Sequence, residues 1–277
     1  MKEPIHILVT LDGAYVPHVR TMLYSLHANN VQERFVVHLL HRSIPEADLE
    51  RLAEHLRLCS CELRPTMVDP SLFADAPQTP RYPQEMYYRL LAGSLLSHDC
   101  KRVLYLDPDV LVINPVRPLW ELDLKGRVFA AAAHTWKTEL GHNVNMMRLN
   151  TEHRYYNSGV LLIDVAAARR EVDPSEVFRY ARDHEPQLIL PDQDVLNALY
   201  GKRTLEVDDR IWNYDARNFS TYLVKSLGEA TPDWVMDHTA ILHFCGRSKP
   251  WNEPYRYRFG LLYKHYRHLA DRALGVW

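Results

Sequence analysis

The strongest constraint on the fold is a regular alternation of apolar strands and amphipathic helices along the first 113 residues. Ile5 to Leu11 is a dense apolar run, as in a strand that is buried on both faces of a sheet. The apolar residues from Val16 to Leu26 recur at helical spacing, and Arg34 to His41 has the pattern of a second strand. This order predicts an α/β protein with a parallel sheet covered by helices.

The same rhythm continues further along the chain. Ser43 to Glu46 has the spacing of a capping box and predicts the start of a helix. Strands are predicted at Glu62 to Val68 and at Arg102 to Leu106, with a helix around Tyr87 to Leu96. The proline-rich stretch from Pro70 to Pro83 is expected to be a loop.

The second half of the chain is less regular. The polar segment from Thr135 to Tyr156 is long for a loop and is interpreted as a lid over a functional site. The basic, aromatic stretch from Tyr255 to Ala273 predicts a helix that packs on the core. The other elements predicted here are three strands and one helix, at residues 128–134, 160–165, 240–244 and 194–200.

The composition is that of an ordinary globular protein. With 277 residues, 47% hydrophobic and 25% charged, the chain can bury the core of one large domain. A net charge of −2 argues against a nucleic-acid binder, which needs a basic face. The beginning of the chain lacks a signal-peptide pattern, no apolar run approaches the roughly 20 residues of a membrane span, and the four cysteines are spaced as free core thiols. We therefore expect a cytoplasmic protein, or one at the inner face of the membrane.

Two carboxylates stand in a short break within apolar strand sequence, at Asp107-Pro108-Asp109. Unpaired buried charges are costly, so this pair needs a cation, either a metal ion or an arginine. Two carboxylates suit Mg²⁺ or Mn²⁺, and an added imidazole favours Mn²⁺. Pro108 fixes one φ angle and limits the geometry. The alternative is an aspartate pair that caps a turn through backbone hydrogen bonds.

Further polar residues follow other predicted strands. Asp12 and Asp107 each stand at the carboxyl end of a strand, where ligands bind in parallel sheets. His243 also ends a predicted strand and is followed by Gly246, which lets backbone approach a ligand, and by Lys249, which can reach a phosphate. The alternative is a core histidine followed by a solvent-facing turn.

Two more segments suit a ligand that is rich in hydroxyl groups. Asn157 and Ser158 place an amide and a hydroxyl at the start of a predicted strand. Asp192 and Gln193 stand near a predicted helix start, where the alternative role for the aspartate is an N-cap. Arg89 contributes only if it faces the carboxyl edge of the sheet.

Taken together, these motifs resemble glycosyltransferase family 8, which includes bacterial lipopolysaccharide α-glycosyltransferases and glycogenin. Four motifs occur in the family's order: Tyr105-Leu106-Asp107-Pro108-Asp109, Tyr156-Asn157-Ser158-Gly159, Asp192 to Asn197, and His243 to Trp251. The resemblance implies the GT-A fold, in which a Rossmann-like nucleotide-binding sheet is covered by helices and joined by a second, smaller sheet region. It implies one domain over residues 1–277, with a nucleotide-binding half (1–113), a donor and acceptor half (114–253) and a carboxyl-terminal helix (254–277).

The resemblance also implies a ligand for each group of residues. It assigns Mn²⁺, with Mg²⁺ as the alternative, to Asp107, Asp109 and His243. It assigns the uracil and ribose of a UDP-sugar to Thr10, Asp12, Tyr15, Pro108 and the backbone of Asp107. It assigns the diphosphate to Gly246 and Lys249. It assigns the donor sugar to Arg89, Asn157, Ser158, Asp192 and Gln193. The family often has Asp-x-Asn-Tyr where this chain has Asp12-Gly13-Ala14-Tyr15, so a base contact by an asparagine is absent.

The implied reaction is retaining transfer of a hexose from UDP-glucose or UDP-galactose to a glycan, glycolipid or glycoprotein. Lys249 would add positive charge at the leaving diphosphate, and Asp192 and Gln193 would stabilise the oxocarbenium ion. Gln193 occupies the family's candidate nucleophile position. Because a neutral amide is a poor nucleophile, front-face attack is favoured over covalent double displacement.

Two other functions remain open from the sequence. A metal-dependent nucleotidyltransferase would usually carry a glycine-rich basic loop after the first strand, whereas Asp12 to Tyr15 is acidic and aromatic. A sugar-nucleotide or glycan-binding module would not turn over its ligand. The basic residues from Tyr255 onward allow weak peripheral contact with a membrane.

Overall fold

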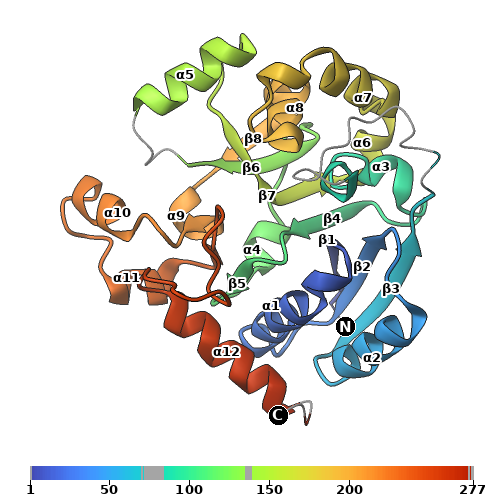
Figure 1. The fold of residues 1–277 in the computed structure, drawn as a ribbon, viewed down its shortest axis with the longest axis vertical. Helices are drawn as coiled ribbons and strands as arrows, with labels where there is room; N and C mark the ends of the chain where they lie inside the picture. The colour runs from blue at the N-terminus through green and yellow to red at the C-terminus, as the bar shows by residue number, and fades with distance from the viewer. Residues whose placement is uncertain (1, 70, 72–83, 135–138, 274, 276–277) are drawn as a thin grey trace.

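A central mixed sheet organises the protein, in a computed structural model that describes residues 2–69, 71, 84–134, 139–273 and 275 (Figure 1). Its seven strands lie in the order β3-β2-β1-β4-β7-β6-β8. In that order they span Cys61–Met67, Phe35–His41, Ile5–Thr10, Arg102–Leu106, Tyr156–Asp164, Phe129–Ala133 and Thr204–Val207. The strands predicted from apolar runs are thus confirmed, with β7 starting four residues earlier than expected.

The direction of β7 differs from the parallel sheet that we predicted. Strands β1 to β4 are parallel, but β7 runs antiparallel to both of its neighbours, β4 and β6. Its start therefore meets the end of β4, where the backbone N–H of Asp107 donates to the carbonyl of Gly159 at 2.8 Å. This reversal brings residues from both halves of the chain to one edge of the sheet.

Helices cover both faces of the sheet because alternate strand residues point to opposite sides. On one face Ile7, Val37 and Leu104 pack against α1 and α2. On the other face Tyr105 and Ile163 pack with α3, α6, α7 and α8. The helices of these two layers are α1 (Val16–Ala28), α2 (Glu46–Arg57), α3 (Ala92–Leu95), α6 (Val165–Glu171), α7 (Pro174–Asp183) and α8 (Pro191–Tyr200).

The smaller sheet implied by the resemblance is present. It has the order β5-β10-β9, with bounds Val110–Val112, Ile241–His243 and Tyr214–Asp215. Its apolar residues form a separate core with α10 (Phe219–Lys225), α11 (Pro232–His238) and α12 (Gly260–Ala273). Short elements complete the described chain: α4 (Arg117–Trp120), α9 (Asp209–Trp212), η1 (Gly13–Tyr15), η3 (Gln84–Tyr87), η4 (Glu185–Gln187) and η5 (Gly201–Arg203).

The last helix packs on the first, as Figure 1 shows. His18 contacts the hydroxyl of Tyr263 at 3.0 Å, and Arg20 forms an ion pair with Asp271. The expected core-packing role of the carboxyl-terminal helix is therefore confirmed. None of the helices in the described part of the chain combines the length and apolar character that crossing a membrane requires.

Two expectations about helices need correction. The predicted capping box is wrong, because Pro45 is the N-cap of α2 and no side chain caps it. The helix expected around Tyr87 to Leu96 is broken into η3 and the single turn of α3. This turn passes very close to α6, because a Cβ on Gly93 would lie 2.4 Å from the backbone nitrogen of Arg169.

The segment interpreted as a lid loop contains a helix, α5 (Glu139–Leu149). Its last turn is fixed by Arg148, which donates to Asp194 of α8 at 2.6 and 2.9 Å. The predicted loop from Pro70 to Pro83 lies outside the described residues, apart from Ser71. All four cysteines are described, and they are buried with free thiols.

Candidate active site

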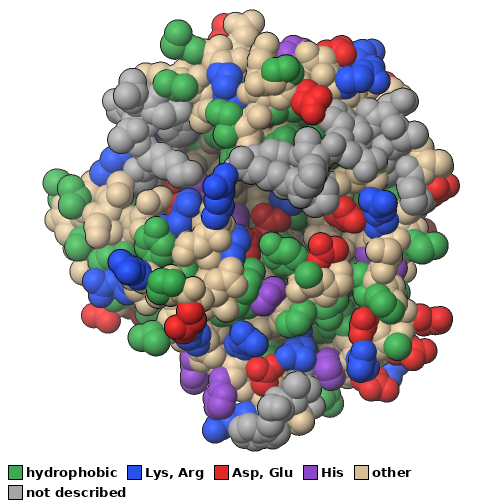
Figure 2. All heavy atoms as spheres, in the orientation of Figure 1, with side chains coloured by type: hydrophobic (Ala, Val, Ile, Leu, Met, Phe, Trp, Pro, Cys, Tyr) green, Lys and Arg blue, Asp and Glu red, His purple; other side chains and the backbone are tan. Residues whose placement is uncertain are grey.

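The hollow of the molecule lies at the carboxyl ends of β1 and β4. Figure 2 shows it near the middle of one face, with acidic side chains visible inside and basic side chains beside it. Among the described residues, ten line this pocket: Thr10, Leu11, Asp12, Tyr15, Glu85, Met86, Arg89, Asp107, Pro108 and Asp109. Seven of them are site residues selected from the sequence, and Asp12 and Asp107 follow strand ends as expected.

Asp107, Asp109 and His243 converge beside this pocket. His243 reaches it because β10 pairs with β5, which follows Asp109 directly. Its Nε2 atom lies 3.3 Å from Oδ1 of Asp109 and 3.8 Å from Oδ2 of Asp107. Neighbouring ligand atoms of one divalent ion have separations of this order, so two carboxylates and one imidazole fit such an ion.

A neighbouring amide orients His243. Nδ1 of His243 lies 2.8 Å from Oδ1 of Asn213, and donation from the ring nitrogen to this oxygen turns Nε2 towards the two carboxylates. The glycine at position 159 is required by the same packing. A Cβ there would lie 2.3 Å from Cε1 of His243 and 2.5 Å from Oδ2 of Asp107, which is too close for any larger residue without displacement.

Two cations neutralise the carboxylates. Lys249 forms an ion pair with Asp109 and donates to the carbonyl of Phe244 at 3.0 Å. Arg89 lies 2.9 Å from Asp107 and 3.3 Å from Asp192, with its guanidinium over the ring of Tyr105. Burial opposes ionisation of Asp109, yet Lys249 and His243 hold the pKa of that carboxyl well below its usual range. Arg89 was expected to contribute only if it faced the carboxyl edge of the sheet, and the structure shows that it does.

The residues expected around a donor sugar form a second hydrogen-bonded group. The hydroxyl of Ser158 donates to Asp192 at 2.8 Å, and the amide of Asn157 donates to Oε1 of Gln193 at 2.9 Å. Burial raises the pKa of Asp192, against the lowering effect of Arg89. The alternative N-cap role is not observed, because Leu190 is the N-cap of α8 and Asp192 lies inside the helix.

Tyr15, which lines the pocket, belongs to a group of aromatic side chains. Tyr15 packs edge-on against Trp251, with ring centroids 6.1 Å apart, and His18 stacks on the same indole at 3.7 Å. Asp12 accepts from the backbone N–H of Ala14 at 2.9 Å, which fixes the turn that carries Tyr15. Gly246 has a φ of +82°, a conformation that favours glycine.

Sequence reasoning missed Asn213, Arg217 and Arg148. Asn213 orients His243, and the guanidinium of Arg217 packs so tightly on Gly246 that a Cβ there would lie 2.2 Å from Nη1. Asp215 anchors Arg217 through bonds of 2.9 and 2.7 Å. The polar run from Asn213 to Asn218 was the available signal, but only the pairing of β9 with β10 reveals its neighbours.

Comparison with known structures and sequences places the chain in a family. A crystal structure of the galactosyltransferase LgtC, in complex with donor and acceptor sugar analogs, superposes with a TM-score of 0.80 and 25% identity over 96% of each chain. The architecture is therefore the GT-A fold of glycosyltransferases. The sequence profile of glycosyl transferase family 8 matches residues 6–254, and the chain belongs to that family.

Two curated relatives show how far this similarity extends. General stress protein A of Bacillus subtilis is 29% identical over 272 residues, which cover 95% of this chain and 93% of that protein. Lipopolysaccharide 1,2-glucosyltransferase of Escherichia coli is 22% identical, over 91% of this chain and 74% of its own length. Family membership supports glycosyl transfer as the activity.

Proposed function

We propose that this protein transfers a hexose, with retention, from UDP-glucose or UDP-galactose to a glycan, glycolipid or glycoprotein acceptor, using Mn²⁺. The observation that carries the proposal is the convergence of Asp107, Asp109 and His243 beside a pocket that also contains Arg89 and Lys249. This set combines ligands for a divalent ion with cations for a diphosphate. Relatives named as a glucosyltransferase and a galactosyltransferase support the choice of hexose.

The pocket suits a nucleotide on one side and a sugar on the other. Tyr15 offers an aromatic face to uracil, while Thr10, Asp12 and the Asp107-Pro108 turn are placed for the ribose. Asn157, Ser158, Asp192 and Gln193 offer amide, hydroxyl and carboxylate groups to the hexose. In this proposal the division of the chain at residue 113 separates the nucleotide side from the donor and acceptor side.

Bond cleavage places negative charge on the diphosphate. Asp107, Asp109 and His243 would hold a Mn²⁺ ion that would supply Lewis acidity there, so no protein general acid would be required. Lys249, held beside Asp109, adds a second positive charge, and Arg217 against Gly246 is placed to add a third. These groups stabilise the transition state because they are aimed at the charge before it develops.

The sugar develops positive charge at its anomeric carbon. In this proposal Asp192, which lies 3.3 Å from the pocket residue Arg89, and the amide oxygen of Gln193, which is linked to it through Ser158, stabilise the oxocarbenium ion. The oxygen of Gln193 already accepts from Asn157 and from the backbone N–H of Ser158, so it is a poor nucleophile. We therefore infer front-face attack, in which the leaving phosphate takes the proton of the acceptor hydroxyl.

A donor screen tests the proposal without knowledge of the acceptor. The purified protein is incubated with Mn²⁺ and UDP-glucose, UDP-galactose, GDP-mannose or a CMP-sugar, and slow release of the nucleotide is measured. Release of UDP from one of the two UDP-hexoses, with the other nucleotides inert, is the expected result. Equal turnover of GDP-mannose contradicts the base specificity, and nucleotide binding without release favours the binding-module alternative.

A further inference from the structure

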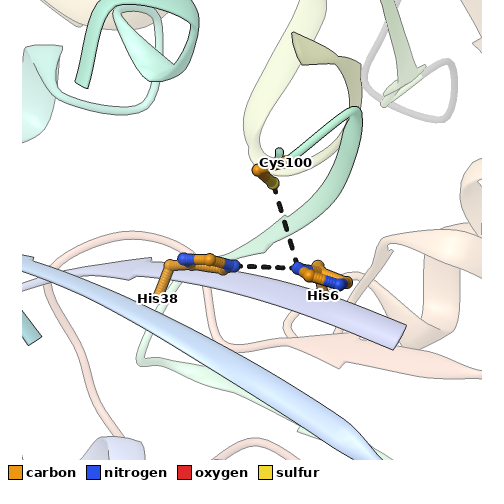
Figure 3. Close-up of side chains that lie close together, drawn as sticks. All are labelled: His6, His38 and Cys100. Atoms are coloured by element: carbon orange, nitrogen blue, oxygen red, sulfur yellow. Dashed lines mark hydrogen bonds between the residues drawn. The ribbon is translucent and has the colours of Figure 1, made fainter. Parts of the chain in front are cut away.

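Another group of side chains that could hold a metal ion lies towards the opposite edge of the central sheet. His6 is the second residue of β1, His38 is in β2, and Cys100 lies two residues before β4. Nδ1 of His6 is 2.9 Å from Nε2 of His38, and Sγ of Cys100 is 3.9 Å from Nδ1 of His6 (Figure 3). The three ligand atoms all lie within 4.8 Å of one another.

The sheet itself brings these residues together. Leu8 is paired with His38 across the parallel β1 and β2 strands, and His6 lies two residues before Leu8, so both imidazoles project from the same face. The ring of Trp120 stacks on His6 at 6.2 Å, and the thiol of Cys100 is anchored near the carbonyl of Arg102 at 3.5 Å. The three side chains are therefore positioned by packing, from segments that are 32 and 62 residues apart in sequence.

The spacing suits a tetrahedral ion. With bonds of about 2.0 Å to nitrogen and about 2.3 Å to sulfur, a zinc ion would separate two nitrogens by about 3.3 Å and nitrogen from sulfur by about 3.5 Å. The observed 2.9 and 3.9 Å differ from these values by only a few tenths of an ångström. Imidazole and thiolate are also ligands that Zn²⁺ prefers over Mg²⁺ or Mn²⁺.

The electrostatic setting is compatible with bound metal. Burial lowers the pKa of His6 and takes that of His38 to about 4, so both rings are neutral near pH 7 and keep a lone pair for a ligand bond. Burial raises the pKa of Cys100, and its thiol proton would leave for solvent when an ion binds. Glu62 and Arg64 on β3 act on the imidazoles with opposite charge.

We propose that His6, His38 and Cys100 form a binding site for Zn²⁺, separate from the candidate active site, with water as the fourth ligand. Water can reach the ion on the side of His6, which is half-buried, while His38 and Cys100 are buried. A bound ion would fasten β1, β2 and the segment before β4 together at the edge opposite the pocket. The competing explanation is a pair of neutral imidazoles that share a hydrogen bond and bind no metal.

Cobalt is a spectroscopic probe that separates these explanations. The metal-free full-length protein is titrated with Co²⁺, and the thiolate-to-cobalt charge-transfer absorption is recorded. We expect one equivalent of Co²⁺ to produce this band and Zn²⁺ to abolish it by displacement. A wild-type protein without the band overturns the proposal, and this measurement needs no variant to fold.

Variants then assign the band to this cluster. Cys100→Ser is expected to lose it, and His6→Gln, at the most exposed of the three positions, is expected to weaken Co²⁺ binding by at least about tenfold. Cys59→Ser is the matched control, because Cys59 is also a buried free cysteine but lies outside the cluster. Cys245 lies in a further candidate group, with His134 and His243. Loss of the band in Cys245→Ser with retention in Cys100→Ser places the metal there instead and refutes the proposal.

Discussion

The two edges of the central sheet gather metal ligands of opposite character. At the carboxyl edge, Asp107 and Asp109 are charged oxygen ligands beside Arg89 and Lys249, and they border a pocket. At the amino edge, the His6, His38 and Cys100 cluster offers neutral nitrogen and sulfur atoms and is packed under Trp120. The comparison teaches that one sheet can combine a site whose oxygen ligands suit a hard divalent ion with a site whose nitrogen and sulfur ligands suit Zn²⁺.

The largest expected effect is a loss of activity when the carboxyl edge is altered. Asp109→Asn removes one charged ligand while keeping the shape of the side chain, so nucleotide release from the UDP-hexose should fall by about a thousandfold or more. Circular dichroism checks that the fold is kept. Asp123→Asn is the control, since Asp123 is an exposed carboxylate that only accepts from the backbone of Lys125. Equal activity of the two variants would break the distinction between the edges.

The next effect tests whether the cations at the carboxyl edge act on the leaving group. Lys249→Met keeps the buried stem but removes the charge, and kcat at saturating donor should fall by about a hundredfold. Lys264→Met is the matched control, because Lys264 forms an exposed ion pair with Glu253. An unchanged kcat in the Lys249 variant means that this lysine only balances Asp109.

Acid should affect the stability of the charged edge. Burial opposes ionisation of Asp215, but its bonds with Arg217 lower its pKa to about 2, below the value in the unfolded chain. The ionised form therefore stabilises the fold above about pH 4, and this contribution disappears as pH falls towards 2. Asp215→Asn should cost about 2 kcal/mol of unfolding free energy at pH 7 and much less at pH 2.

An exposed pair of the same geometry provides the control for this measurement. Asp208 also pairs with the arginine two residues further on, Arg210, but its side chain is 35% exposed. Asp208→Asn should change stability by less than about 1 kcal/mol, since surface ion pairs contribute little. Equal losses in the two denaturant titrations would show that burial of Asp215 is not what makes its pair important.

The smallest expected effect concerns ligand coupling. Mn²⁺ and UDP together should raise the melting temperature by more than the sum of their separate shifts, because the ion reverses the repulsion between the diphosphate and the two aspartates. Zn²⁺ should also raise the melting temperature, and Cys100→Ser should remove this increase. The size of the increase should not depend on UDP. Strictly additive shifts for Mn²⁺ and UDP, or a UDP-dependent zinc shift at Cys100, would contradict the assignment of the two edges.

Local patterns in the sequence predicted the charged edge well. Buried strands leave long apolar runs, so the positions of Asp12 and Asp107 at strand ends followed directly. The motif from His243 to Trp251 added the imidazole and the lysine. The assigned roles of these residues stay predictions, but the structure brings the residues together.

Long-range pairing explains what the sequence did not reveal. The direction of β7 depends on its partners, and nothing in Tyr156 to Asp164 distinguishes a parallel strand from an antiparallel one. Cys100 was interpreted as an isolated core thiol, because its imidazole neighbours come from two other strands. The helix α5 was not predicted for a similar reason, because it is anchored by the bonds of Arg148 to a distant helix rather than by strong local periodicity. The lid role of this segment stays a prediction.

The packing of α12 on α1 has a consequence for how the protein is made. The hydrogen bonds that join these helices span almost the whole chain, with 245 residues between His18 and Tyr263 and 237 between Asn29 and Tyr266. Contacts of such sequence separation form late and slow folding, because a long loop must close first. During synthesis, one side of α1 therefore stays uncovered until α12 has been translated, and this uncovered surface is open to aggregation in that interval.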